Sequence, residues 1–273
     1  MELLVMKSRP TTAVDKLIEF ARPWRFRGKF RLLDPFLPHE GEKIATVFGY
    51  ELNLDLSRKI QRDMYIGNYE RGETNLLRSF LKPGMTVLDV GANVGYYTAL
   101  AARMLGSHGR VFAIEPYPPN FQRLDAWIRK NQAAQIHAFN FALGSEPGSA
   151  QMFSAFAETD APVMVPHNSP AVATVEVRTL DACLDEWKLD RVDFLKLDVD
   201  GSETAVLEGA KDTIAAGKVA AILCEFCEEW LLDVGSSVQA LWTRLLSAGF
   251  KPVWPSSKLP AASLFNQFFV HKS

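Results

Sequence analysis

Short apolar runs alternate with segments of helical period from Met85 to the end of the chain. The runs are rich in β-branched residues, as buried strands are, whereas the segments between them place apolar residues three or four positions apart, as helices do. This alternation predicts an α/β fold with a mostly parallel sheet and helices on both faces. The predicted core strands are Met85–Val90, Arg110–Pro116, Gln135–Gly144, Val192–Gly201 and Val219–Phe226.

The chain ends in two further predicted strands, Gly249–Trp254 and Leu264–Lys272, with no helix between them. They should therefore pair antiparallel, so that the last strand runs against the rest of the sheet. A Pro-rich polar stretch, Ala155–Pro170, lies between two short predicted strands and predicts a mobile flap. The predicted helices are Gly95–Leu105, Asn120–Lys130, Thr179–Trp187, Ser202–Gly209, where Ser202 is a plausible cap, and Val238–Ala248.

Residues 1–80 lack this alternation and predict an arm and cap in front of a core that spans residues 81–273. Thr46–Ser57 predicts a hairpin, and two helical segments follow it at Ile60–Tyr65 and Glu73–Leu81. We therefore expect an arm attached to one domain rather than a second domain.

The arm also contains a segment, Arg22–Arg31, in which basic residues are interleaved with aromatic ones. Such a segment is typical of contact with an anionic lipid, a glycan phosphate or a partner subunit. The alternative is a solvated arm whose aromatic side chains pack on the core. Membrane-surface contact and homo-oligomer formation both stay hypotheses at this stage.

Composition limits the possible partners. Lys and Arg number 30 against 32 for Asp and Glu, and a net charge of −2 argues against a protein that coats nucleic acid. No stretch of the N-P-P-Y type is present, which disfavours methylation of a flipped base. The first apolar run is too short for a signal peptide and no run approaches the roughly 20 residues of a membrane span, so a cytoplasmic location is expected.

The segment Asp89–Gly95 joins a predicted strand to a predicted helix, where ligands of open α/β sheets bind. Gly91 permits a tight turn, and a side chain there should block the close approach of a ligand. Gly95 should let the start of the helix pack tightly on the strand. Glu115 ends the next strand, twenty positions after Gly95, and its carboxylate can accept hydrogen bonds from both hydroxyls of a ribose.

The loop distinguishes between two nucleoside ligands. NAD sites usually have G-x-G-x-x-G, whose middle glycine lets a pyrophosphate reach the backbone, but this loop has Asn93 in the middle position. An acid at Asp89 would also repel a pyrophosphate, whereas it suits the amino-acid end of S-adenosylmethionine. The loop therefore predicts S-adenosylmethionine as the cofactor.

With these residues, the chain resembles the FkbM family of S-adenosylmethionine-dependent methyltransferases. The matching motifs are GYELNLDL, DVGANVG, GRVFAIEP and DFLKLDVDGSE, and the resemblance runs from about Gly49 to the C-terminus. It implies a seven-stranded Rossmann-like sheet and O-methylation of hydroxyls on sugars, glycolipids or natural products. The resemblance places the cofactor at Asp89, Gly91, Asn93, Gly95 and Glu115, with Asn140 near the adenine and Glu70 and Glu73 closing over the methionine end.

Candidate catalytic residues follow the fourth and fifth core strands. Lys196, Asp198 and Asp200 alternate along one strand end, and Glu225 ends the next strand. Asp198 or Glu225 could act as general base towards a hydroxyl acceptor, or both could hold a divalent cation that lowers the pKa of that hydroxyl. The structural alternative is that Asp198 caps the turn at Gly201 and Glu225 pairs with Lys196. No metal-ligand set is assigned.

Three function classes are therefore compared. The leading one is an O-methyltransferase acting on a small or glycosylated hydroxyl compound. An NAD-dependent oxidoreductase and a non-catalytic module that kept the nucleoside-binding fold are the alternatives. The nucleoside residues between Asp89 and Glu115 argue against the non-catalytic module.

Overall fold

The computed structural model describes residues 12–24, 26–153, 163–164 and 170–272. Its centre is a seven-stranded sheet made of β3 (Thr86–Val90), β4 (Arg110–Ile114), β5 (Ile136–Phe139), β9 (Phe194–Leu197), β10 (Ala221–Cys227), β11 (Phe250–Trp254) and β12 (Leu264–His271). The strand order is β11-β12-β10-β9-β3-β4-β5. The pairs from β10 to β5 are parallel, whereas β12 is antiparallel to both β10 and β11. The predicted α/β class and the antiparallel last strand are confirmed.

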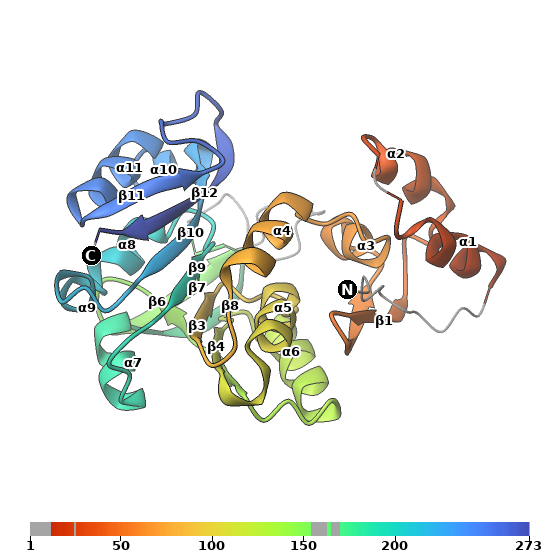
Figure 1. The fold of residues 1–273 in the computed structure, drawn as a ribbon, viewed down its shortest axis with the longest axis horizontal. Coiled ribbons are helices and arrows are strands. Elements are labelled where there is room, and N and C mark those ends of the chain that lie inside the picture. Colours follow the sequence, from red (N-terminus) through yellow and green to blue (C-terminus); the bar gives the residue numbers. More distant parts are fainter. Residues whose placement is uncertain (1–11, 25, 154–162, 165–169, 273) are drawn as a thin grey trace.

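Helices cover both faces of this sheet (Figure 1). Because side chains alternate along a strand, Val87 enters one apolar cluster with α5 and α6, and Leu88 enters a second cluster with α7, α8 and α11. The helices of this region are α5 (Tyr96–Leu105), the 3-10 turn η2 (Gly106–His108), α6 (Pro118–Lys130), α7 (Leu180–Trp187), α8 (Glu203–Glu208), α9 (Lys211–Ala215), α10 (Glu228–Asp233) and α11 (Val238–Ser247). The predicted helices are confirmed, but α9 and α10 were not predicted, and Ser202 precedes α8 without a side-chain capping bond.

A second, three-stranded sheet contains β6 (Ala142–Leu143), β7 (Gly148–Phe153) and β8 (Ala171–Arg178) in the order β6-β8-β7. The prediction of one strand over Gln135–Gly144 is therefore wrong, because the chain leaves the main sheet after Phe139. Asn140 causes the break, since its side-chain amide donates hydrogen bonds to the carbonyls of Glu115 and Pro116. The predicted flap, Ala155–Pro170, lies outside the described residues apart from positions 163, 164 and 170.

The N-terminal part forms α1 (Ala13–Ala21), α2 (Lys29–Leu33), the 3-10 turn η1 (Asp34–Phe36), the hairpin strands β1 (Glu42–Val47) and β2 (Tyr50–Asp55), α3 (Lys59–Tyr65) and α4 (Arg71–Phe80). The hairpin prediction is confirmed, and Phe48 and Gly49 take the positive φ angles that its two-residue turn requires. Side chains of this part, among them Ile18 and Leu52, share one apolar cluster with the helices of the core. The domain boundary near residue 80 stays a prediction. The part of the chain that the structure describes contains no helix with the length and apolar content needed to cross a bilayer.

Candidate active site

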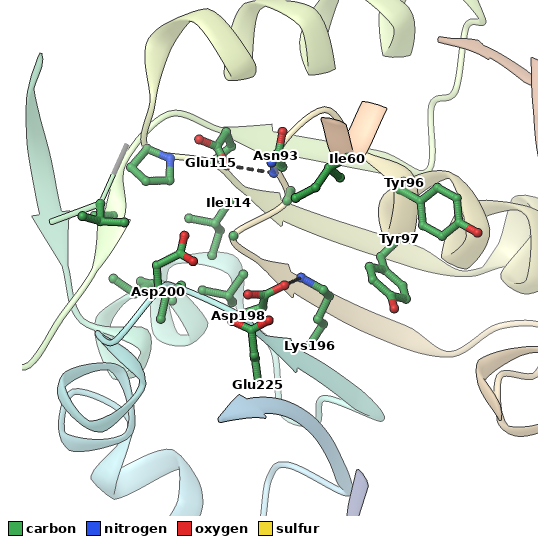
Figure 2. Close-up of a pocket in the computed structure, with 18 of the residues that line it drawn as sticks. Ile60, Asn93, Tyr96, Tyr97, Ile114, Glu115, Lys196, Asp198, Asp200 and Glu225 are labelled. Atoms are coloured by element: carbon green, nitrogen blue, oxygen red, sulfur yellow. Dashed lines mark hydrogen bonds and ion pairs between the residues drawn. The ribbon is translucent and has the colours of Figure 1, made fainter. Parts of the chain in front are cut away.

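A cavity of about 350 Å³ opens at the carboxyl ends of β3, β4, β9 and β10, where open α/β sheets bind their ligands. Two groups of polar side chains occupy it. Figure 2 shows Asn93 and Glu115 at one end, which we call the donor end, and Lys196, Asp198 and Glu225 at the other, which we call the acid end. Core residues such as Tyr97, Ile114 and Trp230 also line it. The arm and the region of the small sheet contribute Ile60, Met64, Tyr69, Glu70, Ala142, Leu143, Met152, Val163 and Met164.

The loop after β3 is held by main-chain contacts. The N–H groups of Gly91 and Ala92 both donate to the carbonyl of Ile114 at 3.0 Å. Gly91 has φ +79°, and a Cβ at this position would lie 1.8 Å from the carbonyl oxygen of Asp198. The expectation that a side chain at Gly91 would obstruct a ligand is therefore corrected: it would first collide with the main chain of the neighbouring strand end.

Gly95 also has a different neighbour from the one expected. A Cβ here would lie 2.6 Å from Leu124 and 2.8 Å from Trp127, both on α6, so the glycine allows helix–helix packing rather than helix–strand packing. The Trp127 indole N–H donates to the carbonyl of Val94 at 2.9 Å, which fixes this contact. Gly95 therefore shapes the loop from behind.

Glu115 lies in the donor end and its orientation is fixed. One carboxylate oxygen accepts the N–H of Asn93 at 2.8 Å and the other accepts the N–H of Tyr117 at 2.9 Å. Burial raises the pKa of Glu115 to about 7, although these two backbone hydrogen bonds act in the opposite direction. The carboxylate therefore reaches the cavity in one orientation, with lone pairs that a ligand diol can use.

Four residues expected at the cofactor do not line the cavity: Gly95, Asp89, Asn140 and Glu73. Asp89 is buried behind the loop, where the Thr98 hydroxyl donates to it at 2.6 Å. Asn140 is exposed, and its amide holds the chain just after Glu115. Both residues support the donor end from outside the cavity, and their contacts with a ligand stay predictions.

Glu70 and Glu73 are also separated by the structure. Glu70, at φ +37°, points into the cavity and accepts a hydrogen bond from the Tyr97 hydroxyl, whereas Glu73 lies outside the lining, 3.5 Å from the Asn266 amide. Burial, followed by the nearby Asp198 carboxylate, raises the pKa of Glu70 to about 7. Glu70 immediately precedes α4 but makes no side-chain capping bond to it.

The acid end is built around one buried cation. The Lys196 ammonium lies 2.7 Å from the Asp198 carboxylate and 5.0 Å from the centre of the Tyr97 ring. Burial opposes its charge, but the carboxylates of Asp198, Asp89 and Glu70 outweigh burial and raise the pKa of Lys196. Lys196 therefore stays protonated and supplies charge rather than acting as a base.

Asp198, Asp200 and Glu225 each place a carboxylate oxygen within 4.8 Å of the other two. Burial first, and then the Asp198 carboxylate, raises the pKa of Asp200 to about 7 and raises that of Glu225 well above its ordinary value. A hydrogen bond with Asp198 also keeps the proton on Glu225. The acid cluster, as we call these three residues, can therefore exchange protons near neutral pH.

Both structural alternatives for this end are wrong. Lys196 pairs with Asp198 rather than with Glu225. The turn at Gly201 is held by Glu203, whose carboxylate accepts the N–H groups of Val199 at 3.0 Å and Gly201 at 3.4 Å.

Three further residues line the cavity. Asp200 was a candidate without a role of its own, and Tyr97 and Trp230 were not predicted to be in the site. Asp200 takes φ +48° beside Gly201, so its side chain lies off the direction of the strand. The Asp-Gly pair after a strand could have indicated such a turn. Nothing in the sequence pattern distinguished Tyr97 and Trp230 from other aromatic core residues.

The buried carboxyls give a testable dependence of stability on pH. Burial raises the pKa of Glu203 to about 8, far above its value in the unfolded chain. The native state then binds the proton more tightly, so this contribution to stability is present at pH 4–5 and is lost as the pH rises towards 8. We expect Glu203→Gln to reduce the loss of unfolding free energy between pH 5 and pH 8 by about 2–4 kcal/mol, measured by urea denaturation.

The exposed Glu208, on the same helix, provides the control. Glu208→Gln should leave the pH dependence as in the wild type. Equal pH dependence in the Glu203→Gln variant and the wild type would contradict the role of burial.

Comparisons with known proteins show the family of this chain. A model of the methyltransferase FkbM domain matches residues 89–252. Protein-L-isoaspartate O-methyltransferase 1 of Arabidopsis thaliana is 54% identical over 43 residues, which cover 16% of this chain and 19% of that protein. Methyltransferase 1 of Beauveria bassiana is 27% identical over 147 residues, or 46% of this chain and 58% of that protein. The solved methyltransferase FkbM of Methylobacillus flagellatus KT is 17% identical with a TM-score of 0.48, covering 78% of this chain and 52% of that one.

The fold and the family model define a methyltransferase domain of the S-adenosylmethionine-dependent class. Since the family model spans more than half of its length, this chain belongs to the FkbM methyltransferase family. The interpretation as an NAD-dependent oxidoreductase is thereby overturned. The chain spans only a fifth to three fifths of the length of the two curated relatives described above.

The residues of the cavity fit S-adenosylmethionine. The fixed carboxylate of Glu115 suits the ribose diol, and apolar side chains such as Ile114 and Leu143 suit an adenine. The carboxylates of the acid end suit a neighbouring sulfonium, because it is a cation.

Proposed function

We propose that the enzyme transfers the methyl group to a hydroxyl of a sugar, a glycolipid or another small molecule, bound at the acid end of the cavity. The acid cluster is the observation that carries this proposal. A hydroxyl becomes a good nucleophile only when it loses its proton during the transfer, and a carboxylate with a pKa near 7 suits that task at neutral pH.

The two ends of the cavity bind different reactants. S-adenosylmethionine supplies an electrophilic methyl group on a sulfonium. Glu115 and the Asn93 loop hold the nucleoside, so that the acceptor is left facing Asp198 and Glu225. The acid cluster receives the acceptor's proton, and Lys196 supplies the positive charge that balances the carboxylates around it. Most of the rate enhancement then comes from positioning the two reactants.

A divalent cation is the second candidate for the same residues, because Asp198, Asp200 and Glu225 offer three oxygens within 4.8 Å of one another. The effect of a chelator on turnover distinguishes the two candidates. Turnover that persists after EDTA treatment supports direct proton transfer. Turnover that disappears in EDTA and returns with Mg²⁺ supports a cation that lowers the pKa of the hydroxyl.

The proposed acceptor class is tested by incubating the enzyme with isotopically labelled S-adenosylmethionine and a panel of matched alcohols, amines and thiols. We expect labelled methyl ethers, identified by mass spectrometry and NMR. Label that appears on nitrogen or sulfur, with none on oxygen, would overturn the proposal.

Glu115→Ala is expected to weaken the binding of S-adenosylhomocysteine by roughly 30- to 300-fold, because two hydrogen bonds to a charged group are lost. Titration calorimetry measures the effect directly. The matched control is Glu146→Ala, which removes an exposed carboxylate remote from the cavity lining. Unchanged affinity in the Glu115→Ala variant would remove the ribose assignment.

A further inference from the structure

Large apolar side chains are exposed on and beside the N-terminal helices. Six of the thirteen large hydrophobic residues with high exposure among the described residues fall within 20 positions, and all four aromatic ones are among these six. Phe20 is 65% exposed, and its ring contacts that of Trp24 at 5.2 Å. We name this surface the N-terminal outer face; its residues are Leu17, Phe20, Trp24, Phe26, Leu32 and Phe36.

The helices that carry this face are firmly attached through their other side. Ile18 and Leu33 are buried in the apolar cluster shared with the core. The buried Asp15 accepts the Tyr65 hydroxyl at 2.7 Å and pairs with Lys43 at 2.9 Å. These helices are thus apolar on both sides, and a surface helix ordinarily is not. An ordered apolar surface of this kind marks a site of interaction.

Charge indicates what the outer face contacts. Residues 20–33 contain five Arg and Lys residues and neither Asp nor Glu. Arg22 and Lys29 are buried, so among the described residues the exposed positive charge of this segment is that of Arg27 and Arg31. Arg27 and Arg31 are exposed, and neither forms an ion pair with another described residue.

We propose that the N-terminal outer face docks the enzyme on an anionic membrane surface. Aromatic and aliphatic side chains flanked by arginines match the boundary between acyl chains and negatively charged headgroups. Figure 1 places α1 and α2 at one extremity of the molecule, away from the main sheet, so the outer face can approach a flat surface without the core in the way.

The outer face is one helix away from the cavity. The Arg22 side chain donates to the main chain of Tyr65 at 2.8 Å, at the end of α3. The same helix places Ile60 and Met64 in the cavity lining.

Vesicle sedimentation tests the proposal with the full chain. We expect binding to phosphatidylcholine vesicles that contain about 30% phosphatidylglycerol, and little binding to pure phosphatidylcholine or at high salt. Arg27→Glu/Arg31→Glu should weaken binding by at least about tenfold, because two cations near the anionic surface are lost. Phe20→Ser/Trp24→Ser should weaken it by a similar factor, because apolar area that enters the boundary is lost. Thermal unfolding checks that the variants remain folded.

Matched controls carry the same changes elsewhere. Lys211→Glu/Lys251→Glu alters two exposed cations, and Leu246→Ser/Val253→Ser alters two exposed apolar residues. Both should bind as the wild type does. Equal binding of the outer-face variants and the controls would overturn the proposal. A second outcome would also overturn it: the wild type does not bind vesicles but self-associates in sedimentation velocity, and Phe20→Ser/Trp24→Ser abolishes this self-association. The outer face would then contact another copy of the chain.

Discussion

Asp198→Asn is expected to lower kcat by about 10²- to 10⁴-fold, the usual contribution of a general base, while the affinity for S-adenosylhomocysteine stays within a few-fold of the wild type. The amide keeps the size of the side chain but cannot accept a proton. Lys196 retains the neighbouring carboxylates of Asp89 and Glu70, so its charge stays balanced in part. Methyl transfer and calorimetric titration, measured on the same preparation, separate the two effects.

The pH dependence provides an independent check on this acid cluster. Burial and Asp198 raise the pKa of Asp200 to about 7, so the proton-accepting form increases as the pH rises through that value. We expect kcat/KM to rise along an acid limb near pH 7 and this limb to shift in Glu225→Gln. Glu229→Gln, an exposed change on α10, should leave the limb in place. Normal turnover in the Asp198→Asn variant would assign Asp198 a structural role only.

Gly91→Ala is expected to cost about 3–5 kcal/mol of unfolding free energy and to abolish cofactor binding. The new Cβ would meet the carbonyl of Asp198 at 1.8 Å, and main chain cannot move aside as a flexible side chain can. The positive φ adds strain of its own. Urea denaturation and titration with S-adenosylhomocysteine measure the two losses.

Gly84 separates the collision from the strain. It has φ +84°, close to that of Gly91, but a Cβ there would have nothing within 4 Å. Gly84→Ala should therefore cost only about 1–2 kcal/mol and leave cofactor binding unchanged. Equal losses in the two variants would show that backbone conformation, rather than the contact with Asp198, makes glycine necessary at position 91.

The sequence was sufficient to predict the parts of the fold in which local pattern and tertiary structure agree. β3, the loop after it, α5 and β4 were predicted with small errors, because apolar period, glycines and turn residues all indicate the same elements. The break after Phe139 was missed because Asn140 makes its hydrogen bonds to residues 24 and 25 positions away. No local pattern records a contact of that kind.

The residues of the site were predicted from their places at the ends of strands. Glu115, Asp198 and Glu225 were placed correctly in the cavity because they end neighbouring parallel strands. Asp89 has the same register parity, being level with Ala113 and Lys196, but it lies two positions before Glu115 and Asp198 and is therefore buried behind the loop. The turn at Gly201 was attributed to Asp198, but Glu203 holds it from the following helix.

The contact between Gly91 and the carbonyl of Asp198 has a consequence for engineering. Gly91 opens the loop after β3, and Asp198 belongs to the acid cluster. Because their main chains are in contact, neither segment can move without the other. Replacing the turn after β9 by one of another shape would therefore displace the loop after β3 as well. Redesign of substrate choice would therefore have to begin at the small sheet, with Met152, and at the arm, with Ile60 and Met64, where the cavity wall can change without altering the loop that holds the methyl donor.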